Sequence, residues 1–533
     1  MRKFENIIQS EITPSTNSLH LKDGALFYYN NGEWKPISSG PNAPNFVGYT
    51  EEEYNSLESK DSNTLYVINS NSGIDALYAG KNKVWKKPSN RFKGQCSLSL
   101  DNTYNLECRI NNIDYDFSDK VDPETRKLDF EYDGDTIYDI QFYGDENEGY
   151  TTLESIECLP DTSKVKSMSN MLSCSDLKTI NLSSIDASNV ISTSYMFENC
   201  PYLQSIDLSG FDMSKVITTE AMFKGCGSLK KVDIPKGLLA NVSYMDEMFY
   251  NSGLEEINTR WEDLIYFPNL LSMKDMFGNC GNLKLLDLTM DAPQLKDMSN
   301  MLSNCQNLES VYLYFYNSKP ENLSGLFSNC INLRSISGRI DGSNATTMTS
   351  MYNGCRSIKH LDMSISSTNK VQDMSYMFNG CSNLVSISDI DVLNTNQVRY
   401  MTSMFQDCGS ITGLVLTFDT RNVVSFSDMF KGCSKLESLT FNGDYFNMSK
   451  ASCYGMFDGC TSLKNIVGSI TGIRVSIDLS SCPLTRISAM VFINGLDTIT
   501  TSQIITFSQV TYNTLSAEDI AIATNKGWTV AVK

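Results

Sequence analysis

Residues 371–387 read VQDMSYMFNGCSNLVSI, and this stretch decides the fold because it recurs along most of the chain. We find about twelve copies at intervals of about 25 to 28 residues, the length of one coil of a solenoid. In a solenoid each repeat buries its apolar side against its neighbours, because it cannot bury that side alone. The Met-Phe-like pair of successive copies begins at Met171, Met196, Met222, Met248, Met276, Met301, Leu326, Met351, Met377, Met404, Met429 and Met456.

A cysteine follows most of these pairs after three or four residues, and only the fourth copy has a serine, Ser252, in its place. Methionine and cysteine side chains in a row suit a soft metal ion. A metal site requires a compact set of ligands that sets one place apart, whereas here one residue type recurs at one packing position. We therefore interpret the row as buried core with reduced thiols and predict no metal site. The cysteines are Cys174, Cys200, Cys226, Cys280, Cys305, Cys330, Cys355, Cys381, Cys408, Cys433 and Cys460.

Within one copy, the apolar residues divide into two segments. Residues 190–203 carry them at the spacing of one face of a short helix or helical turn. In the LQSIDL that follows, Leu203, Ile206 and Leu208 alternate with polar residues, as in a half-buried parallel strand. We predict an α/β repeat, a leucine-rich-repeat solenoid with a parallel sheet of about twelve coils, preceded by small β-rich N-terminal domains.

In outline the coils read VxxMxxMFxxCxxLxxIDLSxFDxS, and they resemble the BspA-type leucine-rich repeats of bacterial and protist surface proteins. The resemblance covers roughly residues 165–475. It is weakest in the fourth copy, at residues 258–269, and in the sixth, at residues 311–322. The resemblance implies a recognition surface and implies no particular ligand.

The segments around the repeats are expected to cap the solenoid, because its ends expose apolar faces. We expect the solenoid itself over residues 161–475 and a C-terminal cap over residues 476–533. In the cap, Ser516 and Asp519 predict a capping box, Gly527 the end of that helix, and residues 528–532 a last strand.

Residues 90–160 alternate apolar and polar residues in two places, which predicts a β-rich domain that doubles as the N-terminal cap. The acidic cluster Asp114, Asp116 and Asp119 could be read as a calcium loop. It lacks the glycine and the terminal glutamate of an EF-hand. We therefore interpret the cluster as a solvated turn.

Residues 49–89 predict a small α+β module, with a capping box at Thr50 and Glu53, a strand in TLYVIN and a hairpin through LYAGKNKVW. This string resembles a short module of structural proteins of tailed bacteriophages. Residues 19–37 look like the β-hairpins that such proteins carry near their virion-attachment end. The resemblance implies that residues 1–48 form a virion-attachment or oligomerisation segment.

The charge and hydropathy of the chain exclude several partners. With 62 acidic and 43 basic side chains, the formal net charge is −19, which repels nucleic acid, so we expect no nucleic-acid partner. No apolar stretch approaches the roughly 18 to 20 residues of a membrane span, so we expect no membrane insertion. The first residues lack the apolar run of a secretion signal, which predicts a soluble product of the cytoplasm.

The sequence offers little for catalysis. Only His20 and His360 are present, which nearly excludes a histidine triad or a multi-histidine metal site. We find no phosphate-binding loop, dinucleotide fingerprint, CxxC pair or nucleophile elbow. Two carboxylates could still meet in space, as in glycosidases, although nothing singles out a pair. We predict no enzymatic activity, no catalytic residues and no cofactor.

A surface-type repeat without a secretion signal and a front end resembling phage structural proteins are both explained by a phage virion protein. The hypothesis is a head-fibre or tail-fibre appendage, made in the host cytoplasm and located on the virion surface. Its N-terminus would bind other virion proteins of the capsid or tail, and its solenoid a host-surface glycan or protein. We expect a homo-oligomer, a trimer or a dimer. The alternative is a bacterial cell-surface leucine-rich-repeat adhesin.

The sixth copy supplies the candidate binding residues. If Val311 and Leu313 point inward, then Tyr312, Tyr314 and Tyr316 stand on the outer face of the sheet. Tyrosine is favoured in binding surfaces because it offers apolar area and a hydroxyl group. The alternative is that these rings only cover one another or an adjoining loop.

Overall fold

The computed structural model describes residues 153–533 except for 160–161, 174, 183–184, 235–238, 259–264, 363–364 and 443–445. Before residue 153 it describes residues 19–22, 25–30, 33–36, 45–49, 54–57, 64–70, 73–79, 82–86, 90–96, 106–111, 113–132, 137 and 140–143, although for some of these only the backbone. The chain divides into two units. One unit comprises Met1–Asn90 with Glu131–Asp135, and the other comprises Arg91–Phe130 with Thr136–Lys533.

The first unit contains two small sheets. Strands β1 (Leu19–Lys22), β2 (Ala25–Asn30) and β3 (Glu33–Pro36) form an antiparallel sheet. In the other sheet, β4 pairs parallel with β5, whereas β5 with β6 and β6 with β7 are antiparallel. The predicted capping box at Thr50 and Glu53 lies outside the described residues. The bounds of these strands are β4 (Asn45–Tyr49), β5 (Thr64–Ser70), β6 (Gly73–Ala79) and β7 (Asn82–Lys86).

Two further sheets precede the repeats. One has the order β10-β9-β12, and the other has the order β11-β8-β13-β14. Strand β13 pairs antiparallel with β8 and parallel with β14, so the β-rich part continues directly into the first coil. The strands are β8 (Asn90–Cys96), β9 (Glu107–Ile110), β10 (Ile113–Asp116), β11 (Lys127–Tyr132), β12 (Ile140–Tyr143), β13 (Leu153–Cys158) and β14 (Thr179–Ile180).

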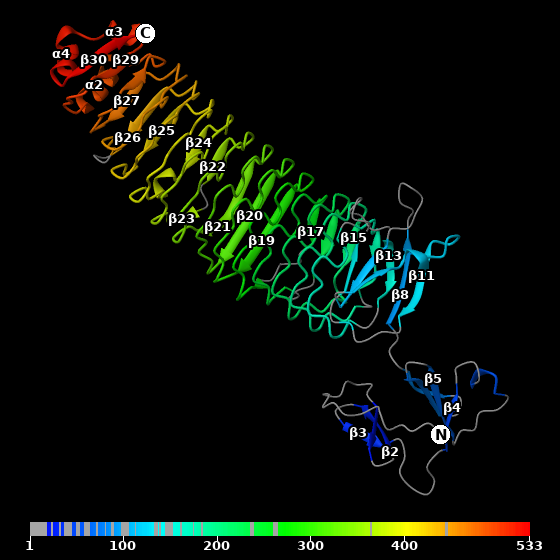
Figure 1. Ribbon diagram of the computed structural model, residues 1–533. Helices are drawn as coiled ribbons and strands as arrows, with labels where there is room; N and C mark the ends of the chain where they lie inside the picture. Colours follow the sequence, from blue (N-terminus) through cyan, green and yellow to red (C-terminus); the bar gives the residue numbers. More distant parts are fainter. Residues whose placement is uncertain are drawn as a thin grey trace. The chain divides into compact units, whose positions relative to one another are not determined.

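The repeats form a leucine-rich-repeat solenoid whose parallel strands follow one another from coil to coil (Figure 1). The predicted alternation is confirmed, because Leu203, Ile206 and Leu208 are buried while Ser205 and Asp207 are exposed. The strands are β15 (Ser205–Asp207), β16 (Lys231–Asp233), β17 (Glu256–Asn258), β18 (Ile265–Tyr266), β19 (Leu285–Asp291), β20 (Ser310–Tyr316), β21 (Ser335–Asp341), β22 (His360–Asp362), β23 (Ile365–Ser366), β24 (Ser386–Ser388), β25 (Gly413–Leu416), β26 (Ser438–Phe441) and β27 (Asn465–Gly468).

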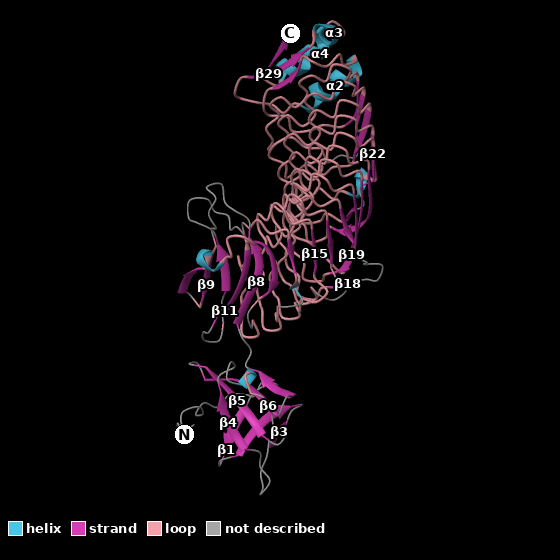
Figure 2. Ribbon diagram, turned by 90° about the vertical axis from the view of Figure 1, so that its right-hand side faces the viewer, coloured by secondary structure: helices cyan, strands magenta, loops and turns pink. Residues whose placement is uncertain are grey.

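The Met-Phe segments form the opposite side of the coils, and they are turns rather than α-helices (Figure 2). Their backbone N–H groups alternate between two kinds of bond: one to the next coil, as from Phe197 N to Met222 O at 2.9 Å, and one to the carbonyl three residues earlier in the same segment, as from Met196 N to Thr193 O at 3.2 Å. Tyr195 and Asn199 have φ angles of 60° and 54°, and such left-handed residues interrupt helical hydrogen bonding. Of the two predicted conformations, the structure has the helical turn.

The core between the two sides consists of the repeated apolar residues. The phenylalanines stack in register, with ring centroids 5.5 Å apart for Phe197 and Phe223 and 5.3 Å apart for Phe378 and Phe405. The methionine that precedes each ring, or Leu326 before Phe327, is also buried. Because each coil shares this core with its neighbours, its stability depends on them.

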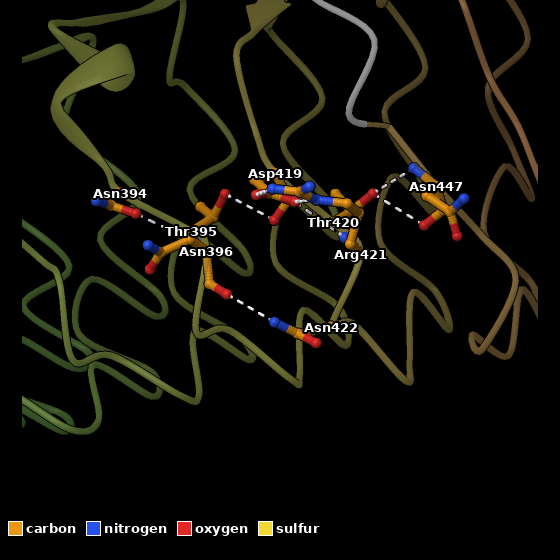
Figure 3. A network of polar contacts seen from close by, with 8 residues as sticks. All are labelled: Asn394, Thr395, Asn396, Asp419, Thr420, Arg421, Asn422 and Asn447. Atoms are coloured by element: carbon orange, nitrogen blue, oxygen red, sulfur yellow. Dashed lines mark hydrogen bonds and ion pairs between the residues drawn. The ribbon is translucent and has the colours of Figure 1, made fainter.

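Polar side chains join the loops of neighbouring coils (Figure 3). The buried Thr420 donates its hydroxyl to Asn447 O at 2.9 Å and accepts from Asn447 N at 2.7 Å. Thr395 makes the equivalent bond to Asp419 O at 3.1 Å. On the surface, Arg421 forms an ion pair with Asp419 at 2.6 Å. The bonds of Thr395 and Thr420 fix the spacing of the coils at the loops, whereas the ion pair lies within one loop.

The C-terminal cap continues the solenoid, which has about 14 turns in all. The ring of Phe492 packs edge-on against Phe457, the last ring of the stack, at 5.7 Å. The predicted capping box of Ser516 and Asp519, the left-handed Gly527 and the last strand are all present. The elements are β28 (Ile477–Leu479), α2 (Arg486–Gly495), β29 (Gln503–Phe507), α3 (Gln509–Tyr512), α4 (Ala517–Asn525) and β30 (Trp528–Val532).

Candidate binding surface

The three predicted tyrosines lie together on the outer face of β20. Val311 and Leu313 are buried, as the prediction requires. Tyr312 is 40% exposed and Tyr316 is 42% exposed, and Tyr314 between them is partly buried. The long strand β20 therefore presents a row of three aromatic rings.

The rings contact one another within this row. The ring centroids of Tyr312 and Tyr314 are 6.4 Å apart with an angle of 22° between the planes, and those of Tyr314 and Tyr316 are 4.5 Å apart. The rings therefore do cover one another in part, as the alternative interpretation expected. About two fifths of both Tyr312 and Tyr316 nevertheless remain open to solvent, so the row can still stack on a partner.

The neighbouring strands add residues that the sequence pattern did not single out. In the register of the sheet, Asp291 of β19 lies between Tyr316 of β20 and Tyr266 of β18, and Tyr266 is 56% exposed. On the other side of β20, Arg339 of β21 lies beside Tyr314. We name this group the tyrosine surface: Tyr266, Asp291, Tyr312, Tyr314, Tyr316 and Arg339.

Asp291 is an unusual member of the tyrosine surface. Its Oδ2 accepts a hydrogen bond of 3.1 Å from Asn317 Nδ2. Its Oδ1 is buried and has no hydrogen-bond partner in the part of the chain that the structure describes. A buried carboxylate oxygen without a partner is unfavourable, and a ligand hydroxyl that reached it would remove that cost. The surface thus combines aromatic rings, which suit a sugar or an apolar partner, with a polar acceptor.

The cysteine row forms hydrogen bonds that the sequence did not predict. Cys226 Sγ donates to Phe197 O at 3.0 Å, and Cys381 Sγ donates to Tyr352 O at 3.1 Å, so each thiol joins its coil to the preceding one. Burial raises the pKa of the Cys280 thiol to about 11 and that of Cys330 to about 12, which keeps them protonated. The predicted burial is confirmed for the described members of the row, whereas Cys174 lies outside the described residues.

The other candidates from the sequence are dispersed. Asp114 is paired with Arg109 at 2.7 Å and Asp119 with Lys120 at 2.7 Å, while Asp116 accepts from Ser118 N at 2.8 Å. His360 is exposed on β22, and nothing is described of the His20 side chain. Within the described ranges, no three histidine, cysteine or acidic side chains gather as metal ligands, and no helix is long and apolar enough to cross a membrane.

The solenoid and its exposed sheet define a leucine-rich-repeat protein, and one known family matches its repeats. A family model matches residues 147–261, 271–384 and 346–470, more than half of the chain. The chain belongs to this family, which is described as Mycoplasma protein of unknown function, DUF285. A second model, described as Phage tail tip domain, matches residues 50–69. No curated protein sequence matches the chain significantly.

Several solved structures are similar to parts of the chain. A leucine-rich cell surface protein from Faecalibacterium prausnitzii A2-165 is 13% identical, with 62% of this chain and 93% of that chain covered and a TM-score of 0.21. In the mouse RP105/MD-1 complex the match is 13% identical, covers 70% of this chain and 67% of that chain, and has a TM-score of 0.21. In the TLR13-ssRNA13 complex the match is 13% identical, covers 71% of this chain and 62% of that chain, and has a TM-score of 0.17. The fold assignment therefore rests on the strand and turn geometry described above.

Proposed function

We propose that this protein is a bacteriophage virion appendage, a head fibre or tail fibre, and a binding protein rather than an enzyme. Its N-terminal part attaches to capsid or tail proteins, and its solenoid recognises a glycan or protein of the host surface. The observation that carries the proposal is the match of residues 50–69 to a phage tail tip domain in a chain whose other part is a solenoid.

The tyrosine surface supports the recognition part of the proposal. Recognition surfaces are enriched in tyrosine, because its ring gives contact area and its hydroxyl group gives hydrogen bonds at a small entropic cost. The solenoid repeats its core from coil to coil and leaves the outward positions of the sheet free to differ, which allows such a surface to form without loss of the fold.

Electron microscopy of phage particles labelled with an antibody against this protein tests the proposal. The expected result is label at one kind of site on the particle surface, at the head or at the tail, and the symmetry of that site gives the oligomeric state. Particles without label, together with label on the envelope of uninfected cells, would refute the virion assignment.

A truncated chain without residues 1–48 tests the attachment. If these residues anchor the protein, the truncated chain should fold and oligomerise in solution but should be missing from purified particles. Normal occupancy of the truncated chain on particles would place the anchor elsewhere in the chain.

The alternative function is a bacterial cell-surface adhesin, and the family description favours it because it names a cellular bacterium. The two functions share the recognition surface and differ in where the protein is attached. Neighbouring genes for capsid or portal proteins would support the virion, whereas a longer reading frame with an apolar leader would support the adhesin.

A further inference from the structure

A surface cavity of about 560 Å³ lies beside the tyrosine surface, where three consecutive coils contribute side chains. We name it the basic pocket. Its lining residues lie on or near β21, β22 and β24, and Figure 1 shows β21 and β22 near the middle of the array of strands. Its lining residues are Arg334, Ser357, Lys359, His360 and Asn383. In a chain with a net charge of −19, a cavity lined by an arginine, a lysine and a histidine and by no acid is a marked local exception.

The pocket coincides with a break in a ladder of alternating charges. The residues that precede β16, β17, β19, β20 and β21 are in turn Lys230, Glu255, Lys284, Glu309 and Arg334. Among them, Lys230 pairs with Glu255 at 3.0 Å and Glu309 with Arg334 at 3.8 Å, in each case between coils. Backbone bonds keep the ladder in register, as from Arg334 N to Glu309 O at 2.8 Å.

At the next coil the alternation fails, because Arg334 is followed by Lys359 and then by Val385. Val385 N donates to Lys359 O at 2.8 Å, whereas among the described residues no such backbone bond joins Lys359 to Arg334, so the backbone ladder is interrupted at the same place. Like charges in neighbouring strand positions are unfavourable, and an anion between them would offset the repulsion. Within the described ranges, no acidic side chain forms an ion pair with Lys359. Arg334 is already paired with Glu309, so the excess positive charge that an anion would meet is that of Lys359.

The donors in the pocket match the oxygens of an anionic group. The guanidinium group of Arg334 is a planar fork that can donate two parallel hydrogen bonds to a carboxylate or a sulfate. His360 is held in place by a bond of 2.9 Å between its Nδ1 and Ser386 Oγ. Asn383 is held by a bond of 2.8 Å from its Nδ2 to Arg356 O. The lining is therefore positioned before any ligand arrives.

The pocket is also within reach of the tyrosine surface. Strand β22 contacts β21, and β21 pairs with β20, which carries Tyr312. Tyr312 pairs with Ser337 of β21, which follows the pocket residue Arg334 by three positions, so at about 3.3 Å per residue about 10 Å along the strand separates the two levels. A chain of a few sugar rings spans that distance and can contact both places.

We propose that the basic pocket binds the negatively charged group of an acidic oligosaccharide, a sugar carboxylate or a sugar sulfate ester, while a neighbouring ring of the same saccharide stacks on Tyr312. This assignment rests on the proposed function, recognition by the solenoid, and gives it a ligand class. The net charge of −19 repels a dense polyanion, so the ligand carries isolated charges separated by neutral rings.

Calorimetric titration of the full-length protein at low salt with three hexasaccharides tests this proposal. A hyaluronan fragment carries only carboxylates, a κ-carrageenan fragment only sulfate esters, and a chitin fragment neither. We expect binding of one anionic fragment at least tenfold tighter than that of the chitin fragment. The fragment that binds identifies the charged group. Equal affinity for all three, or no binding of either anionic fragment, overturns the proposal.

Substitutions locate the binding. Lys359→Gln and Arg334→Gln should each lower the affinity for the anionic fragment by about tenfold or more, while the unfolding temperature stays unchanged. The matched control Lys230→Gln, at the same ladder position of another coil, should leave the affinity unchanged. Full affinity in both pocket variants overturns the assignment. If particles carry no label but the titrations show binding, only the virion attachment is refuted. If particles carry label but the titrations show no binding, only the pocket assignment is refuted.

Discussion

The turn side and the sheet side of the solenoid differ in what repeats. On the turn side, Phe197, Phe223 and Phe378 occupy the same position in different coils, and all are fully buried. On the sheet side, one outward position holds Asp287, Tyr312 and Ser337 in three successive strands. Packing permits one kind of residue in the first case and many in the second. Variation confined to the sheet face is typical of a scaffold that presents a binding surface.

Strand length shows the same difference within the sheet. The early strands β15, β16 and β17 have three residues each, whereas β19, β20 and β21 have seven. A longer strand places more outward side chains in one row, since every second residue faces solvent. Apart from Tyr266 on the short strand β18, the tyrosine surface lies on these seven-residue strands. The predictions below separate residues of the core from residues of this face.

The largest expected effect is on thiol reactivity. The thiolate is the reactive form, and burial both blocks access and raises the pKa of the Cys381 thiol to about 12. Labelling of native protein at pH 8 should be at least about 100-fold slower than in denaturant, because it requires local opening. It should accelerate with pH until the thiol exposed by opening, whose ordinary pKa is about 8.5, is ionised. Mass spectrometry of quenched samples measures both rates.

A cysteine introduced next to Cys381 provides the control. Ser382 is exposed, so the variant Ser382→Cys should gain one thiol that labels rapidly in the native state. If the native cysteines of the row label as fast as this added one, the assignment of the row to the core is wrong. Disulfides in the intact mass would contradict the prediction of reduced thiols.

The next effect concerns the ring stack. Phe378 is fully buried between Tyr352 and Phe405, with centroids at 5.7 and 5.3 Å. Phe378→Ala should lower the free energy of unfolding by about 3 to 5 kcal/mol, because it leaves a cavity shared by three coils. Urea denaturation measures the change, and the outward Ser386→Ala should stay within about 0.5 kcal/mol. The reverse order of the two effects would show that the faces are assigned wrongly.

A smaller loss is expected at the loops. Thr420→Val keeps the side-chain shape but removes the buried hydroxyl group that bonds to the N–H and C=O of Asn447, at a cost of about 1 to 3 kcal/mol. Thr412 is exposed and is the matched control, so Thr412→Val should change the unfolding free energy by less than about 0.5 kcal/mol. Equal effects of the two variants would mean that the bond between the coils contributes nothing.

The sequence predicts those parts of the fold that depend on spacing along one coil. The buried side of LQSIDL and the capping box at Ser516 follow from local periodicity and local capping chemistry, and both are confirmed. The bond from Cys226 Sγ to Phe197 O joins residues 29 positions apart, and no local pattern contains that register. The left-handed Tyr195 is equally invisible to periodicity, because tyrosine rarely adopts that conformation.

The residues of the candidate surfaces also divide into those that the sequence could predict and those that it could not. The outward direction of Tyr312 follows from the alternation within one strand, so it could be predicted. Tyr266 could not, because it belongs to the irregular fourth copy and reaches the surface only through pairing of β18 with the end of β19. The basic pocket was missed because Arg334, Lys359 and Asn383 come from three coils, each at a position that looks merely solvated.

The smallest expected effect on stability, and the most informative one for function, is that of the double variant Tyr312→Ala with Tyr314→Ala. The two rings lie outside the core and contact chiefly each other and Tyr316, so the unfolding temperature should change little. Binding to host cells or to the anionic hexasaccharide should fall by at least about tenfold, because stacked rings contribute much of the energy of such surfaces.

The control removes two exposed tyrosines from elsewhere on the solenoid, Tyr202 at 52% exposure and Tyr454 at 78%. It reproduces the loss of aromatic area and hydroxyl groups but leaves the tyrosine surface intact, so its binding should equal that of the unchanged protein. If the Tyr312 and Tyr314 double variant binds normally, recognition lies elsewhere. If the double variant unfolds at a much lower temperature while the control does not, the tyrosine row stabilises the long strands by packing. At this coil, residues of the sheet face would then contribute to stability as core residues do.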